Sequence, residues 1–280
     1  MSAGGAFATA GQHMTFRSAK PSRYAVIPSP ETTMSNRLAS KLLAELVGTF
    51  SFVFIGAGAA AIAGTGVGLP GVVAVAFAHG LTIMAFAFAY GSVSGGHMNP
   101  AVTVGVLAAG AMSVGEAVGY IVSQLIGGIA GALLLRTVLG GSATGLGVPA
   151  LAHNLALGAT TLTITPTVGF LIEAVLAFFL VTVVLSTAVA GRAGSLAPLA
   201  IGMTLTLNIL MGGPLTGAPF NPARALGPMV ATGNYGDVWL YLAAPIVGAI
   251  IAAILHTGLA WLAYEEAASA PDGARKAPAE

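Results

Sequence analysis

Six long apolar stretches constrain the fold of this chain more than any other feature of its sequence. The hydrocarbon core of a bilayer is about 30 Å thick, so a helix that crosses it needs about 20 consecutive apolar residues. Six stretches meet this length: 39–61, 70–91, 114–138, 167–190, 196–213 and 238–262. We therefore expect an all-α membrane protein with six transmembrane helices.

Charged residues are few, and most lie near the two ends of the chain. Only 7% of the 280 residues are charged, against about 25% in soluble domains, and the mean hydropathy is +0.90. A net charge of +1 offers no basic surface to nucleic acid, so we expect no nucleic-acid partner. The sequence has no cysteine, and neither a metal cluster nor a nucleophile–base pair nor a cofactor motif stands out. We expect no enzyme, no cofactor and no metal.

The composition divides the chain into a channel-sized core and two polar tails. We expect disordered tails at 1–37 and 264–280, although the acid-poor first segment also has the composition of an organelle transit peptide. Lysine and arginine favour the cytoplasmic side of short flanks. Three flanks agree on a cytoplasmic location for both termini and one does not: Arg37 and Lys41, Arg192, and Arg275 and Lys276 agree, whereas Arg136 does not. We expect an inner or plasma membrane as the location.

The two halves of the core resemble each other. Glu45 and Glu173 each lie early in an apolar stretch, and two stretches later each half carries the tripeptide Asn-Pro-Ala, at 99–101 and 221–223. The repeats extend over about 38–138 and 167–263. Because each half has three spans, an odd number, the repeats must be inverted relative to each other, with the functional centre at their interface.

Each Asn-Pro-Ala predicts the start of a short helix. Asparagine is a preferred N-cap residue, and proline is favoured at the first helical position. The segments 99–109 and 221–231 are each about 16 Å long as helices, too short to cross the bilayer. Inversion brings their N-termini, each with a partial positive charge, face to face at mid-membrane. The residues expected at this hydrogen-bonding, cation-repelling point of a pore are Asn99, Pro100, Ala101, Asn221, Pro222 and Ala223.

The doubled Asn-Pro-Ala, the repeated glutamate and the run Gly-Gly-His-Met-Asn-Pro-Ala-Val-Thr resemble the aquaporin, or major intrinsic protein, family. The resemblance covers about residues 38–263. It implies an hourglass fold of six spans and two re-entrant half-helices. It also implies one pore per subunit of a homotetramer in the lipid bilayer, with water and small neutral solutes as its permeants.

The family's selectivity filter is an aromatic/arginine constriction, and the resemblance places it at His79, Ile209, Ala218 and Arg224. The water-specific bacterial filter has phenylalanine and histidine at the first two positions. The set found here instead resembles that of the vacuolar (tonoplast) plant aquaporins, which pass water and often ammonia. In some of those proteins a loop histidine joins the outer vestibule, and His153 is the candidate here.

Several of these residues also have simpler interpretations. His79 could be an ordinary packing residue of an apolar helix, and Arg224 could pair with a buried glutamate. A permanent cation in the pore wall would repel cations, and Ile209 would widen the constriction. Glu45 and Glu173 could relay protons, but we expect them, with His97, to brace the pore loops by accepting backbone N–H groups.

We therefore expect a passive channel for water, with ammonia and other small neutral solutes as further permeants and with protons and ions excluded. A glycerol-type channel is the strongest competing interpretation. Ala225 and Met229 lack the charges that glycerol-passing members carry at these positions, whereas Tyr241-Leu242 is a mixed signal. An ion-coupled secondary transporter and a junctional protein with a nearly closed pore are also compatible with the sequence.

Overall fold

The computed structural model describes residues 34–64 and 71–269. Within this part, six helical segments are long and apolar enough to cross a membrane: Arg37–Ala63, Gly71–Ser94, Val114–Val138, Pro166–Val189, Gly194–Thr216 and Val238–Leu262. They coincide with the six expected stretches to within a few residues. Most of the two expected tails, 1–33 and 270–280, lies outside the described residues. Residues 34–37 and 264–269, which we expected to belong to the tails, are helical.

The elements of repeat one are followed by a hairpin and then by the elements of repeat two. Repeat one contains α1 (Met34–Phe52), a π-helical turn (Val53–Ala57), α2 (Gly58–Ala63), α3 (Gly71–Ser94), α4 (Pro100–Ala108) and α5 (Val114–Val138). The connection holds a 3-10 turn (Gly145–Gly147), β1 (Leu155–Leu157) and β2 (Thr160–Leu162). Repeat two contains α6 (Pro166–Val184), a π-helical turn (Leu185–Val189), a 3-10 turn (Gly194–Leu196), α7 (Ala197–Thr216), α8 (Pro222–Thr232) and α9 (Val238–Ser269).

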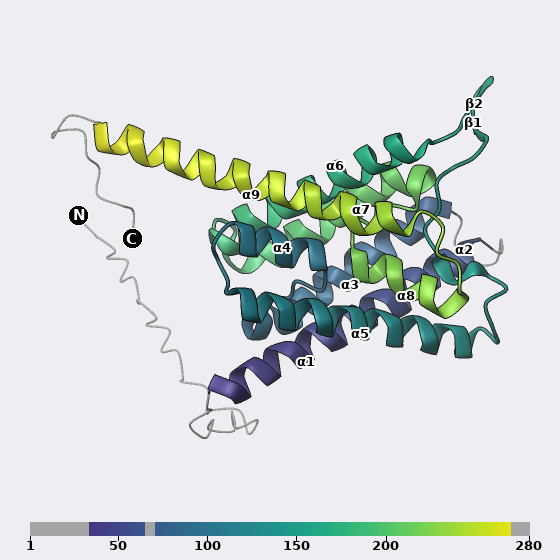
Figure 1. Ribbon diagram of the computed structural model, residues 1–280, viewed down its shortest axis with the longest axis horizontal. Coiled ribbons are helices and arrows are strands. Elements are labelled where there is room, and N and C mark those ends of the chain that lie inside the picture. Colours follow the sequence, from purple (N-terminus) through teal and green to yellow (C-terminus); the bar gives the residue numbers. More distant parts are fainter. Residues whose placement is uncertain (1–33, 65–70, 270–280) are drawn as a thin grey trace, which may run out of the picture.

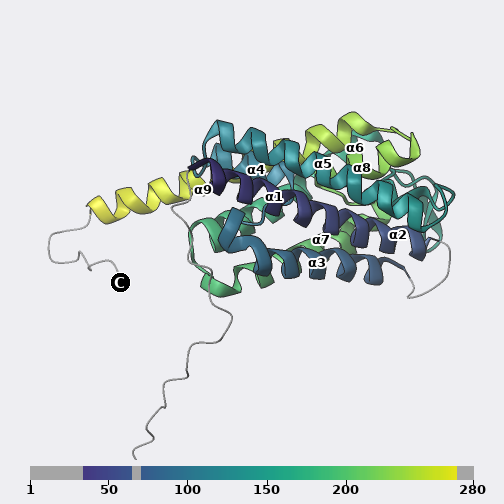
Figure 2. The same cartoon turned by 90° about the horizontal axis from the view of Figure 1, so that it is seen from below.

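The helices pack as two interlocked repeats. Helix α1 packs against α5 as α6 packs against α9, and α3 packs against α7 between the halves. Each half-helix also packs against a long helix of the other repeat, α8 against α5 and α4 against α9. Figures 1 and 2 show α4 and α8 within the bundle, with the start of α1 and the end of α9 at one end of it. This exchange places both half-helix N-termini near the centre.

Glycine permits the close approach of the half-helix to its neighbour. A Cβ atom on Gly128 of α5 would lie 2.7 Å from the carbonyl oxygen of Ala223, in the first turn of α8. Real Cβ atoms do not approach backbone so closely, so a side chain at this position would push α8 away from α5. Gly128 therefore permits the contact that positions the second half-helix against α5.

The antiparallel hairpin β1–β2 departs from the purely helical expectation. Leu155 pairs with Leu162, and the turn contains Gly158 with φ of 61°. Glycine adopts this left-handed conformation without steric cost. In Figure 1 the hairpin projects from the end of the bundle opposite the start of α1. The membrane-spanning part remains all-α.

Arg136, which does not fit the charge bias, has a hydrogen-bond partner at its end of the bundle. Its Nη1 donates a 3.0 Å hydrogen bond to the carbonyl of Ala231, in the last turn of α8. Carbonyls at a helix C-terminus lack intrahelical partners, and a cation there also interacts favourably with the negative end of the helix dipole. Arg136 therefore secures the end of the second half-helix.

Candidate functional site

Both half-helices begin at the expected asparagines. The backbone of Asn99 and of Asn221 is extended, and a proline follows each. Asn99 Oδ1 accepts the N–H of Ala101 at 2.8 Å, and Asn221 Oδ1 accepts the N–H of Ala223 at 3.0 Å and of Arg224 at 3.2 Å. Each side chain thus satisfies N–H groups that a helix start leaves without intrahelical partners.

The two asparagines also tie the pore loops to each other. Asn99 Nδ2 donates to the carbonyl of Phe220 at 3.1 Å, and Asn221 Nδ2 donates to the carbonyl of Met98 at 2.9 Å. Met98 and Phe220 both have positive φ, 49° and 27°, which is uncommon and costly for residues other than glycine. Since an amide has two hydrogens and each of these bonds uses one, each asparagine retains a donor for a molecule in the pore.

Glu45 braces the first pore loop. One carboxylate oxygen accepts the Ser94 hydroxyl at 2.7 Å and the His97 N–H at 2.9 Å. The other accepts the Met98 N–H at 2.6 Å and Gln124 Nε2 at 2.7 Å. The side chain is fully buried, so these four donors replace the water that a carboxylate otherwise needs.

Glu173 braces the second loop with fewer donors. It accepts the Thr216 hydroxyl at 2.5 Å and the Phe220 N–H at 2.7 Å. Pro219 precedes Phe220 as His97 precedes Met98, and it has no N–H to donate. Both carboxylates therefore contact the loops that precede the asparagines, but the two braces are unequal.

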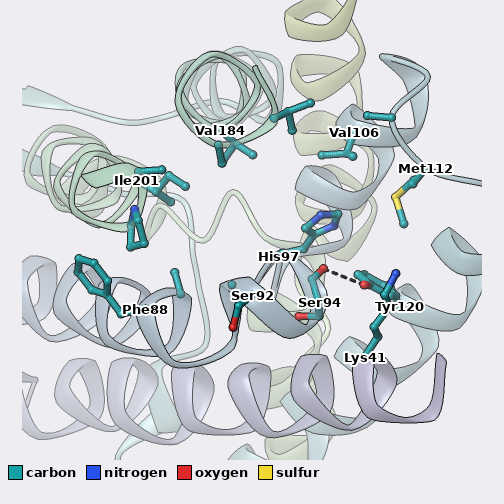
Figure 3. Close-up of a pocket in the computed structure, with 18 of the residues that line it drawn as sticks. Lys41, Phe88, Ser92, Ser94, His97, Val106, Met112, Tyr120, Val184 and Ile201 are labelled. Carbon is teal, nitrogen blue, oxygen red and sulfur yellow. Dashed lines mark hydrogen bonds between the residues drawn. The ribbon is translucent and has the colours of Figure 1, made fainter. Parts of the chain in front are cut away.

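Three cavities lie along the inside of the bundle. An inner cavity of about 740 Å³ opens beside Lys41 and His97, and Figure 3 shows this end with the His97 imidazole at its edge. A central cavity of about 20 Å³ adjoins it and contains both Asn99 and Asn221. The remaining wall of the central cavity is largely apolar: Ile83, Val102, Leu180, Val184, Ile201 and Leu205. An outer cavity of about 600 Å³ is bordered by Ile209 and Arg224.

His79 and Arg224 meet beside the outer cavity, which Arg224 borders. Arg224 Nε donates to His79 Nε2 at 3.3 Å, and Arg224 Nη1 donates to the carbonyl of Gly147 at 2.9 Å. Because arginine only donates, His79 Nε2 must be the acceptor, which assigns the ring proton to Nδ1. Nδ1 in turn donates to the carbonyl of Val75 at 2.8 Å. Both ring nitrogens are engaged, so His79 holds Arg224 rather than offering a polar edge to a permeant.

Ile209 and Ala218, the other two expected filter positions, are both buried. Ile209 is buried and borders the same outer cavity as Arg224. Ala218 is buried in the second pore loop, and its N–H donates to the Thr216 hydroxyl at 3.1 Å. His153 is exposed before β1 and is not among the residues that border the outer cavity. The structure thus pairs His79 with Arg224 and places Ile209 beside Arg224 at the outer cavity, whereas His153 is not at this cavity.

Arg224 does not use a glutamate as its hydrogen-bonding partner. In residues 37–64 and 71–262, the one ion pair is that of Lys41 with Glu116, 2.6 Å apart beside the inner cavity. His97 has a double position: its backbone N–H donates to Glu45, while its Nδ1 lies 3.1 Å from the Thr103 hydroxyl and its ring borders the inner cavity. Bracing and contact with the pore therefore coexist at this residue.

Comparison with known proteins agrees with this arrangement. The major intrinsic protein family matches the sequence over residues 32–256. This chain belongs to the major intrinsic protein family. The resemblance inferred from its motifs is thereby confirmed, and the chain is an integral multi-pass membrane protein.

Plant proteins are among its relatives within the family. Aquaporin NIP1-2 of Oryza sativa subsp. japonica is 40% identical over 213 residues, which cover 76% of this chain and 69% of the relative. Nodulin-26 of Glycine max is 35% identical over 231 residues, 82% of this chain and 81% of the relative. Probable aquaporin TIP3-2 of Arabidopsis thaliana is 41% identical over 181 residues, 64% of each chain.

A solved structure confirms the fold of this family member. The aquaglyceroporin from Plasmodium falciparum superposes with a TM-score of 0.70 over 81% of this chain and 99% of that chain, at 23% sequence identity. At this identity the likeness concerns the fold alone. The expected hourglass of six spans and two half-helices is confirmed.

Several residues that hold the site of this major intrinsic protein were not predicted from its sequence. Gln124 could have been recognised, because it is a polar residue within an apolar span. Its amide donates to Glu45 and to the Thr103 hydroxyl. Tyr120 and Tyr241 occupy equivalent places in the two repeats and donate to the carbonyls of Ser94 and Thr216, respectively. These tyrosines fix the ends of α3 and α7, from which the pore loops start.

Proposed function

We propose that this protein is a passive water channel whose pore passes between Asn99 and Asn221. The central cavity carries this proposal, because its volume is about 20 Å³ and both asparagines border it. A cavity needs about 10–15 Å³ to hold one water molecule, so water would pass this point in single file. The two wider cavities on either side would supply and receive it.

We propose that the same centre excludes cations and protons. Two helix N-termini face each other there, each with about half a positive elementary charge, and Arg224 adds a full charge toward the outer side. The Asn99 and Asn221 amides each keep one N–H donor, and a water molecule that accepts both would have its oxygen occupied. It could then accept no proton from the next water in the file.

We propose ammonia and other small neutral solutes as further permeants. Ile209 and Ala218 contribute apolar walls to the filter, and the bond to Arg224 removes the polar edge of His79. Molecules of water size that need few hydrogen bonds would lose little on entering such a filter. The narrow centre disfavours glycerol, as do the uncharged Ala225 and Met229.

The geometry of Glu45 and Glu173 disfavours a secondary transporter. An ion-coupled carrier needs an acid that faces the substrate path near mid-membrane. Both carboxylates are fully buried and accept hydrogen bonds from the pore loops. We assign them, together with His97, to bracing.

We further propose a homotetramer with both termini in the cytoplasm of a plasma or inner membrane. The charge bias supports the orientation, because Lys41 and Gly194 border the same inner cavity and Arg192 lies two residues before Gly194. Arg136 lies toward the other end and has its own structural partner. The tetramer is carried by the family resemblance.

The test is stopped-flow light scattering on proteoliposomes under an osmotic gradient, repeated with an ammonia gradient and an internal pH dye. Fast shrinkage together with fast alkalinisation supports the whole proposal. Fast shrinkage alone removes ammonia from it. Rates no greater than those of empty liposomes would overturn the channel function.

A further inference from the structure

The first span is interrupted by a π-helical turn, Val53–Ala57, at the level of the filter. Such turns are rare within α-helices and occur frequently at functional sites. The His79 ring lies directly on this turn: an added Cβ on Gly56 would lie 2.5 Å from His79 Cδ2 and 2.6 Å from Nε2. Phe52, just before the turn, meets the ring edge-on with the centroids 5.3 Å apart. Only glycine at position 56 leaves room for the imidazole in this place.

Ala57, the next residue of the turn, packs against Gly147, whose carbonyl is the second hydrogen-bond acceptor of Arg224. An added Cβ on Gly147 would lie 2.6 Å from the carbonyl oxygen of Ala57. Gly147 has φ of 70°, a conformation that side chains rarely adopt, and its own carbonyl accepts Arg224 Nη1. The backbone of the 3-10 turn Gly145–Gly147 therefore packs against Ala57 of the first span. Ala57 directly follows Gly56, on which the His79 ring packs.

We propose that the π-helical turn Val53–Ala57 is a positioning element of the filter, which sets the place of Arg224 through His79 and Gly147. Arg224 Nε and Nη1 are each held by a group that packs against this turn, at Gly56 and Ala57. The proposal rests on the channel function, since it assumes that permeants pass Arg224. It assigns a role in selectivity to residues that do not themselves touch the permeant.

The direct test is Gly56→Ala, compared with Gly58→Ala as the matched control. The methyl group that Gly56→Ala introduces displaces the imidazole away from the first span, and the bond to Arg224 Nε is lost. Losing a buried hydrogen bond to a charged group reduces the occupancy of the held arginine position by about tenfold or more. A Cβ at Gly58 meets only the flexible side chain of Leu135, at 3.2 Å. In proteoliposomes we expect Gly56→Ala to change the ratio of water to glycerol permeability by about tenfold and Gly58→Ala to leave this ratio unchanged.

The variant His79→Ala distinguishes a positioning role of Gly56 from general damage to the fold. In His79→Ala the ring is absent, so adding Gly56→Ala should change neither the water permeability nor the ratio of water to glycerol permeability. A wild-type ratio of water to glycerol permeability in Gly56→Ala would overturn the proposal. An equal change of this ratio with and without His79 would also overturn it, because the effect would then not act through the ring. If the wild type itself conducts no water, the channel function fails instead, so the two failures are distinguishable.

Discussion

The unequal bracing of the two pore loops predicts unequal costs for the same substitution, Glu45→Gln against Glu173→Gln. At Glu45 four donors converge on the carboxylate, and a glutamine offers only one acceptor oxygen. That oxygen can keep the Ser94 hydroxyl and the His97 N–H. The new amide nitrogen would then face the Met98 N–H and the Gln124 amide, donor against donor.

Gln124 can relieve one of these conflicts but not the other. Its Oε1 is buried without a hydrogen-bond partner, so a flipped amide could accept from the new nitrogen, with loss of the bond from Gln124 Nε2 to the Thr103 hydroxyl. The Met98 N–H keeps no acceptor, and an unsatisfied buried donor costs about 1–3 kcal/mol. We therefore expect Glu45→Gln to lower the free energy of unfolding by about that amount.

At Glu173 the same substitution can be accommodated. The glutamine oxygen can keep the Phe220 N–H, and its amide can donate to the Thr216 hydroxyl, which can turn toward the Gly212 carbonyl 3.4 Å away. No backbone donor is orphaned, in contrast to Met98 at the first loop, and we expect a smaller loss of less than about 1 kcal/mol. The assay is thermal or denaturant unfolding of both variants in one detergent. Equal losses, or a larger loss for Glu173→Gln, would refute the reasoning from donor counts.

Three further variants test other contacts. Arg136→Met removes the bond to the last turn of α8 and should cost about 1 kcal/mol in the same unfolding assay. Lys41→Met breaks the partly exposed ion pair with Glu116 and should change the unfolding free energy by less than about 1 kcal/mol, with water flux unchanged in proteoliposomes. The double variant His79→Phe, Ile209→His should lose ammonia flux and keep water flux, measured with the pH dye and by light scattering.

Each of these variants has an outcome that contradicts its premise. Unchanged stability of Arg136→Met would mean that the arginine does not secure the half-helix. A large loss of stability or flux in Lys41→Met would show that the ion pair matters more than its exposure indicates. Ammonia flux that survives in the double variant would remove His79 and Ile209 from the filter.

The spans and half-helices could be predicted because their signals are local. Apolar length alone identifies a span, and Asn99-Pro100 and Asn221-Pro222 combine an N-cap with a helix-starting proline in adjacent positions. The inverted pairing of the two motifs followed from counting three spans per repeat. The hydrogen bonds of Asn99 and Asn221 follow the same inverted symmetry, since each side chain donates to the pore loop of the other repeat.

The support of the filter could not be predicted because it depends on contacts between distant segments. The bond of His79 to Arg224 joins α3 to α8, and the carbonyl of Gly147 comes from a loop without periodicity. Gly56 is one glycine in a glycine-rich chain, and the residues around it do not predict a π-helical turn. The hairpin β1–β2 escaped notice for a related reason, since its strands are three residues each and carry no alternating pattern.

The central claim is that water passes the narrow point between Asn99 and Asn221. Leu205 borders this point and is 2% exposed, whereas Leu207 on the same helix is 61% exposed and faces away from it. The decisive measurement is the osmotic water permeability of Leu205→Trp and Leu207→Trp in proteoliposomes, with equal reconstitution verified for both. We predict that Leu205→Trp abolishes the water flux and that Leu207→Trp retains the wild-type rate. Full flux through Leu205→Trp would contradict the account.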